Sequence, residues 1–120
     1  MAERLTYDWD EAAASTCGPL TTGATCEGFS TARARIRRET EAHYHEVAHE
    51  LYRVEEGRGR LKTRHRETGT TAEYDLRPGV EVVIEPDEVH QTRPEDELVV
   101  TAVSVPAWSE DDEFAAGDLF

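Results

Sequence analysis

Histidines and carboxylates gather in the stretch HYHEVAHE at residues 43–50. In an extended strand, side chains two residues apart share a face, so His43 and His45 can aim at one point. Glu50 or His49 can join them where the chain bends. Imidazole nitrogens with a carboxylate oxygen suit a first-row transition metal, and two histidines with one carboxylate form the ligand set of open non-haem iron sites. The stretch therefore predicts a metal site.

Composition argues against several kinds of partner. The chain has 120 residues, with 26 acidic against 13 basic residues and a formal net charge of -13, and Lys62 is its single lysine. Nucleic acids and anionic membrane surfaces are polyanions, so this charge disfavours both as partners. An acidic, lysine-poor composition is similar to that of proteins from salt-rich cytoplasm. We therefore expect folding stability to rise in molar salt, because repulsion among carboxylates is screened.

Cysteine usage and hydropathy favour a soluble, cytoplasmic protein. Cys17 and Cys26 form no C-x-x-C pair, so free thiols are the simpler interpretation, with one disulfide as the alternative. The sequence begins without an apolar run of signal-peptide length. No apolar segment approaches the ~20 residues that a membrane helix needs.

Short strand-like segments, separated by turn residues, must position the histidines. From Thr31 to Arg38, small or apolar residues alternate with arginines, which is a period of two. The segment from Leu98 to Val105 is the most apolar and is expected to be a central strand. About seven or eight such strands, with turn signals roughly every 8–12 residues and no long helix, predict an all-β sandwich or barrel.

We expect a single domain with two extensions. Residues 1–29 form a leader that packs on the barrel, residues 30–105 form the barrel, and residues 106–120 form an acidic tail. Trp108 and Phe114 are expected to pack this tail back on the barrel.

Three residues near the histidines are candidates for substrate contact. The alternating arginines favour a solvated face, but Arg35 or Arg53 at a pocket mouth would clamp an anionic substrate in a bidentate fork. Tyr52 shares strand parity with Glu50 and is expected to face the interior near the metal. Its simpler role is core packing. The alternative is a substrate hydrogen bond or proton donation, which makes Tyr52 and Glu50 the candidate catalytic residues.

The spacing of the first cluster resembles the cupin superfamily. The first cupin motif, G-x5-H-x-H-x3-4-E-x6-G, is matched by His43, His45, Glu50 and Gly57, while Arg37 stands at its leading glycine. The spacing to Gly57 places Glu50 ahead of His49 as the ligand, unless a bulge re-aims the strand and yields an all-histidine site.

A second cupin motif, G-x5-P-x-G-x2-H-x3-N, is degraded. Gly79 and His90 fit it, whereas Glu85, Asp87 and Pro94 replace its proline, inner glycine and asparagine. His90 alone would be interpreted as an ordinary hydrogen-bonded histidine. With the first motif present, ligation is favoured.

The resemblance implies a double-stranded β-helix, or jelly-roll barrel. It implies one divalent transition metal (Fe, Mn, Ni, Co or Zn) near the barrel axis, held by His43, His45, Glu50 and His90. It further implies a small-molecule ligand or substrate and a homodimer. Cupins resembling this chain include metal-dependent dioxygenases, isomerases and lyases that act on small polar metabolites. The alternative is a non-catalytic binding or sensor module with a structural or ligand-holding metal.

Overall fold

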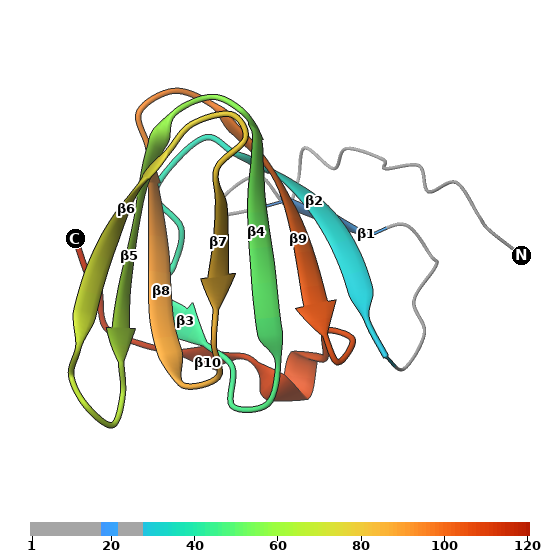
Figure 1. Ribbon diagram of the computed structural model, residues 1–120, viewed down its shortest axis with the longest axis vertical. Coiled ribbons are helices and arrows are strands. Elements are labelled where there is room, and N and C mark those ends of the chain that lie inside the picture. Colours follow the sequence, from blue (N-terminus) through green and yellow to red (C-terminus); the bar gives the residue numbers. More distant parts are fainter. Residues whose placement is uncertain (1–17, 22–27) are drawn as a thin grey trace, which may run out of the picture.

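The computed structural model describes residues 18–21 and 28–120, and nearly all of its regular structure is β-strand. The strands form two five-stranded antiparallel sheets, ordered β1-β2-β9-β4-β7 and β10-β3-β8-β5-β6 (Figure 1). The all-β architecture expected from the sequence is confirmed. The elements are β1 (Gly18–Thr21), β2 (Ser30–Ile36), β3 (His43–Tyr44), β4 (His49–Glu56), β5 (Gly59–His65), β6 (Thr71–Leu76), β7 (Glu81–Ile84), β8 (Glu88–Pro94), β9 (Leu98–Val105), the 3-10 helix η1 (Glu110–Asp112) and β10 (Phe114–Ala115).

One apolar core lies between the sheets. Ile36 of β2, Leu61 of β5 and Leu98 of β9 are each 0% exposed and belong to one cluster. Fully burying such a side chain contributes about 1.5–3 kcal/mol. The strand β9 lies between β2 and β4, as expected for the most apolar segment. Residues of both sheets therefore share one buried core.

Strand β8 is buried on both faces. Four consecutive residues, Val89 to Thr92, are each 1% exposed. The amide nitrogen of Gln91 donates to the Asp118 carboxylate at 3.1 Å, and its oxygen accepts from the Leu119 N–H at 2.6 Å. The end of the chain therefore covers the outer face of β8.

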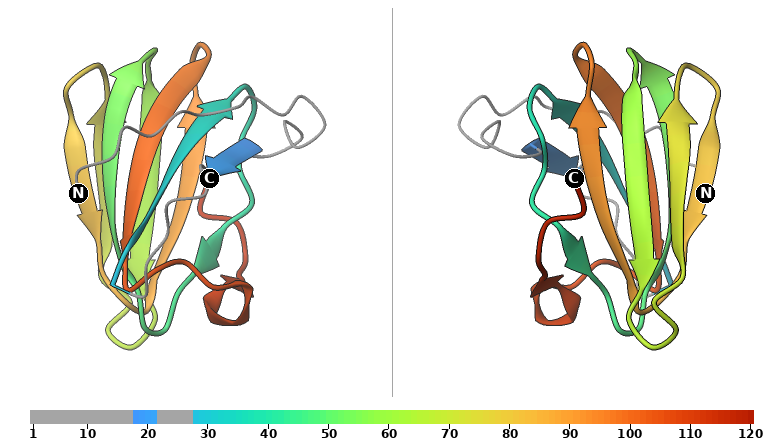
Figure 2. Two further views of the ribbon diagram at one scale, coloured as in Figure 1. Left: turned by 90° about the vertical axis from the view of Figure 1, so that its right-hand side faces the viewer. Right: turned by 90° about the vertical axis from the view of Figure 1, so that its left-hand side faces the viewer.

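The segment after Pro106 joins the second sheet. Its strand β10 pairs with β3, with Phe114 opposite Tyr44. The two rings stack at 5.2 Å, so Phe114 packs the segment on the barrel as expected. β3 and this segment lie together on one side of the molecule (Figure 2). The C-terminal residues are thus placed to take part in a site built on β3.

Two turns with positive φ shape the two ends of the barrel, one after β4 and one before β8. Gly57 has φ 85, and a Cβ there would lie 2.0 Å from the Glu97 carbonyl oxygen, so only glycine fits. Asp87, at the inner-glycine position of the second motif, has φ 65, which Asp tolerates better than most residues. Its N–H donates to the His45 carbonyl at 2.7 Å, and its carboxylate accepts from Arg66 at 2.9 Å. Asp87 therefore holds the backbone at His45 in place, and its carboxylate is paired with Arg66.

Only part of the expected leader is described. Its strand β1 pairs with β2 in antiparallel register. Cys17 and Cys26 lie outside the described residues, so their redox state stays a prediction. Within the part of the chain that is described, no helix has the length and apolar character required to span a membrane.

Candidate metal centre and its pocket

Both sheets contribute to one cluster of potential metal ligands. His43 lies directly opposite His90 in the β3–β8 pair, and His45 follows two residues after His43. Glu50 enters from the other sheet, near the start of β4. One ligand atom from each of these four residues lies within 4.8 Å of the others. The structure therefore brings together the four ligands that the cupin resemblance implies.

Backbone carbonyls orient all three imidazoles in the same way. Nδ1 lies 3.1 Å from the Glu41 carbonyl oxygen in His43, 2.6 Å from that of Asp112 in His45, and 3.0 Å from that of Glu88 in His90. A carbonyl oxygen only accepts, so each Nδ1 carries the proton and donates. In its neutral form, each ring presents the lone pair of Nε2, the atom left for a metal.

The environment sets the protonation states of the cluster. Burial lowers the pKa of His90 to about 3, and the nearby His43 adds to this effect. Burial acts to lower the pKa of His45, but the Glu50 carboxylate beside its Nε2 raises it above the usual value. Burial acts to raise the pKa of Glu50, but the histidines, His45 first, hold it below the usual value. Neutral His90 and anionic Glu50 are forms that bind metal, and metal binding displaces the proton that His45 favours.

The donor set fits a divalent transition metal. Nε2 of His45 and of His90 are both buried without a hydrogen-bond partner. His45 Nε2 lies directly against a Glu50 oxygen, so its contact within the cluster is with another candidate ligand. A buried polar atom left unsatisfied costs about 1–3 kcal/mol. Three imidazoles and a carboxylate around one point would be satisfied together by Fe, Mn, Ni, Co or Zn.

His49 does not replace Glu50. In β4, His49 is exposed while Glu50 is 8% exposed and belongs to the cluster. The strand alternates regularly at this point, and its register shift lies later, between Val54 and Glu56. Glu50 is therefore the ligand candidate on β4.

The C-terminal segment supports the loop between His45 and β4, and no sequence pattern indicated this role. The Asp112 carboxylate accepts from three consecutive backbone N–H groups, at 2.8 Å from Glu46, 3.1 Å from Val47 and 3.0 Å from Ala48. Its carbonyl also orients His45. A local signal exists only for the 3-10 helix itself, because Ser109 accepts from the Asp111 N–H as a cap. The loop contact spans more than sixty residues, and nothing local indicates it.

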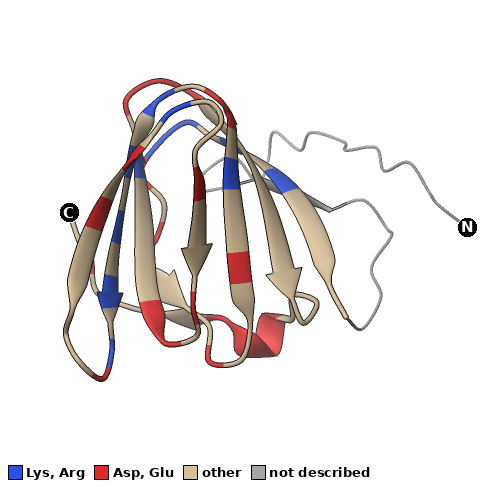
Figure 3. Cartoon of the chain, in the orientation of Figure 1, with Lys and Arg blue, Asp and Glu red and all other residues tan. Residues whose placement is uncertain are grey.

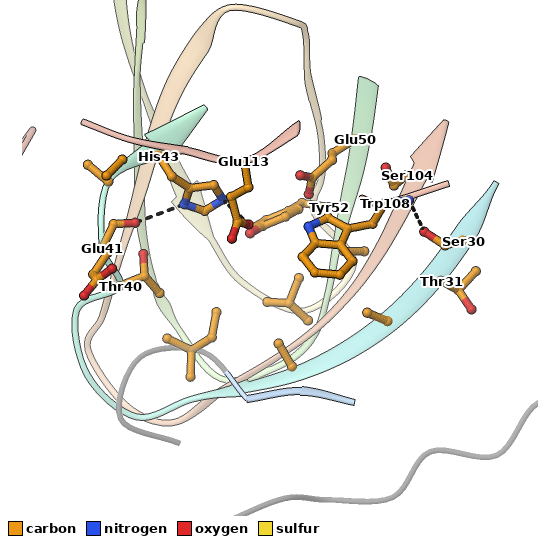
Figure 4. A pocket seen from close by; sticks show the side chains of 17 residues that line it. Ser30, Thr31, Thr40, Glu41, His43, Glu50, Tyr52, Ser104, Trp108 and Glu113 are labelled. Carbon is orange, nitrogen blue, oxygen red and sulfur yellow. Dashed lines mark hydrogen bonds and ion pairs between the residues drawn. The ribbon is translucent and has the colours of Figure 1, made fainter. Parts of the chain in front are cut away.

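A pocket of about 470 Å³ opens beside the cluster (Figure 4). His43, Glu50 and Tyr52 line its inner part, while Trp108 and Glu113 reach it from the C-terminal segment. Ala32, Ala34, Ile36, Val100, Ala102 and Ala115 form much of the remaining wall. The pocket has the size and mainly apolar walls of a small-molecule site, with a few polar groups that fix orientation.

The other predicted site residues separate clearly. Tyr52 is 9% exposed, lines the pocket and meets the His90 ring edge-on at 6.2 Å. Arg35 and Arg53 do not line the pocket, because the alternation of β2 and β4 places them on the outer face. Arg35 pairs there with Glu97 at 3.1 Å, and Arg53 pairs with Glu55 at 3.3 Å.

Comparison with known families places this geometry. The AraC-like ligand binding domain family matches residues 28–111. The chain belongs to this family. AraC-like ligand binding domains are cupin-type domains, so the cupin resemblance drawn from the motifs is confirmed. No curated protein matches the sequence.

Solved structures share the fold of this AraC-like ligand binding domain. A variant of Streptomyces Pac13 with uridine has a TM-score of 0.78 at 11% identity, over 100% of this chain and 95% of that one. Pac13 is described as a nucleoside dehydratase. The capsular polysaccharide assembling protein CapF from Staphylococcus aureus has a TM-score of 0.76 at 14% identity, over 98% of this chain, which spans only 33% of CapF.

A further neighbour confirms the type of barrel. A Klebsiella pneumoniae protein with a double-stranded β-helix domain has a TM-score of 0.71 at 13% identity, over 97% of this chain and 100% of that one. The predicted double-stranded β-helix is therefore confirmed. At such low identities these likenesses show the fold alone.

Proposed function

We propose that this protein is a metal-dependent cupin enzyme that binds a small polar metabolite against one divalent transition metal. One observation carries this proposal: buried Nε2 atoms without hydrogen-bond partners converge with the Glu50 carboxylate beside a pocket of about 470 Å³. His43, His45, Glu50 and His90 would hold the metal. Dioxygenase, isomerase and lyase chemistry are the reaction types that cupins of this kind suggest.

The chain's own groups supply binding and proton transfer around such a metal. When bound, the metal supplies Lewis acidity or lowers the pKa of a coordinated water. The Tyr52 phenol lines the pocket and is the candidate for a ligand hydrogen bond or proton donor. Glu113 lies 3.7 Å from His43 Nε2 and is placed to accept a hydrogen bond or proton from a ligand. The apolar wall excludes water from a bound ligand.

A non-catalytic binding module is the second candidate. The match to a family described as a ligand binding domain favours it. In that case the same pocket would hold a small molecule unchanged, and the metal would orient it.

One experiment separates the two candidates. Metal-loaded protein is incubated with pools of small polar metabolites, and mass spectrometry follows both the compounds retained and the compounds consumed. His45→Ala serves as the metal-site control, and His49→Ala, an exposed neighbour on β4, serves as the matched control for the substitution itself. An enzyme consumes a compound in the wild type and in His49→Ala, but not in His45→Ala. A binding module retains it unchanged. A metal-loaded wild type that neither consumes nor retains any compound contradicts both functions.

A homodimer and a cytoplasmic location also belong to this proposal. The edge strands β6 and β7 expose Tyr74 and Val83, which are 39% and 59% exposed. Open sheet edges favour association with another chain. Sedimentation at high salt and micromolar concentration tests the dimer, and a clean monomer there would exclude it under those conditions.

A further inference from the structure

We propose that the pocket selects an uncharged or cationic ligand with a flat apolar body, and discriminates against organic anions. This inference rests on the proposed function, because the ligand lies in the same pocket beside the metal cluster. It replaces the anion clamp that the arginine pattern suggested, since those arginines lie on the outer face.

The charge lining the pocket is acidic. Three glutamates, Glu41, Glu50 and Glu113, line it, with the Glu41 side chain exposed to solvent, and the described lining residues include neither lysine nor arginine. A divalent metal would offset Glu50 and one further carboxylate. In Figure 3, acidic residues also gather around η1 and the neighbouring ends of the strands. An anionic ligand would enter against this field, whereas a cation would be attracted by it.

The indole of Trp108 favours a ligand with a flat ring. Trp108 lines the pocket and is 52% exposed, so one part of its indole is free to contact a ligand. Its backbone N–H donates to the Ser30 hydroxyl at 2.8 Å, which ties it to β2. Ser104 donates to the Pro106 carbonyl at 2.9 Å and fixes the turn before it. A flat ring resting on the indole would gain stacking energy and shield the apolar wall.

Glu113 is the group that would accept a hydrogen bond from the polar end of the ligand. It faces the pocket from the C-terminal segment, between His43 and Trp108 (Figure 4). One of its carboxylate oxygens lies 3.7 Å from His43 Nε2, and its side chain is 43% exposed. A carboxylate accepts hydrogen bonds and donates none, so it favours an amine or hydroxyl over a ligand carboxylate or phosphate.

Three small molecules with one aromatic body test the inference. Phenylethylamine, 2-phenylethanol and phenylacetate are titrated into metal-loaded protein by NMR, and metal content is measured on the same samples. We expect the amine and the alcohol to bind at least about tenfold more tightly than phenylacetate, a difference of ~1.4 kcal/mol. Glu113→Gln should reduce the amine-to-acid ratio about fivefold. Glu110→Gln, which changes an exposed carboxylate on η1 outside the pocket lining, should leave the ratio unchanged.

The outcomes distinguish this inference from the proposed function. Equal or tighter binding of phenylacetate to protein that holds its metal overturns the inference alone. Failure of all three compounds to bind at millimolar concentration also overturns it. Protein that holds no metal but still prefers the amine supports the pocket inference and contradicts the metal-dependent function.

Discussion

Removing the Asp112 carboxylate is expected to weaken metal binding although Asp112 is not a ligand. This carboxylate holds the loop between His45 and Glu50 through three backbone N–H groups. Asp112→Ala leaves these donors without their partner and frees the loop that aims His45. A change in the groups that orient metal ligands typically costs about 10–100-fold in affinity. We expect the loss of metal affinity in Asp112→Ala to fall in that range. The free energy of unfolding should also fall by ~2–4 kcal/mol, because hydrogen bonds to a charged group contribute about 1.5–3 kcal/mol each and water replaces them only in part.

The intermediate substitution sharpens the test. Asp112 Oδ1 accepts from Glu46 and Val47, and Oδ2 accepts from Ala48. Asp112→Asn keeps one accepting oxygen and opposes the Ala48 N–H with a second donor, so its metal affinity should lie between those of the wild type and Asp112→Ala.

Affinity is measured by competition with a chromophoric chelator, at a temperature where thermal melts show every variant to be folded. Asp111→Asn is the control, because it removes the neighbouring exposed carboxylate of η1. An Asp112→Ala variant that binds metal as tightly as the wild type would show that this carboxylate does not position the ligands. An Asp111→Asn variant that weakens metal binding to the same extent would show the same.

Three further predictions concern stability. The free energy of unfolding of the metal-free protein should fall by ~2 kcal/mol between about pH 6.5 and 4.5. In this range the unfolded chain protonates His90, whereas the folded chain, in which His90 has a pKa of about 3, does not. Urea unfolding measures this loss, which should be smaller in His90→Asn. A curve that is flat over this window would contradict the buried neutral state of His90. Gly57→Ala should lower the free energy of unfolding by at least ~2 kcal/mol, because its Cβ would meet the Glu97 carbonyl. Gly69→Ala, at φ 74 with open space around it, should lower the free energy of unfolding by about 1 kcal/mol. Equal losses of the two variants in chemical denaturation would contradict the steric clash at Gly57. The melting temperature should rise from low to molar KCl, since the net charge is -13, and a flat melting temperature would argue against carboxylate repulsion.

Most of the ligand cluster could be predicted from the sequence because three of its four residues lie close together in the chain. Strand parity alone places His43 and His45 on one face, and the motif spacing adds Glu50. His90 needed the family pattern, since only the pairing of β3 with β8 sets it opposite His43. Parity also excluded His49 once β4 proved regular at its start.

The pocket wall was out of reach because it depends on contacts between distant parts of the chain. Asp112, Glu113 and Trp108 lie in a segment whose composition indicates only an acidic tail. Their roles appear when β10 pairs with β3 and carries them to the site. The arginines of β2 failed as pocket candidates for a related reason: alternation gives two faces, but only the fold decides which face meets the core.

The metal content of the purified protein shows whether the four residues form a metal centre. Wild type, His45→Ala and His49→Ala are each saturated with iron, manganese, cobalt, nickel or zinc, freed of excess metal and submitted to elemental analysis. We expect about one equivalent of metal per chain in the wild type and in His49→Ala, and the loss of this metal in His45→Ala. Metal-free wild type after reconstitution, or equal metal in all three proteins, would contradict the assignment of His43, His45, Glu50 and His90 as a metal centre.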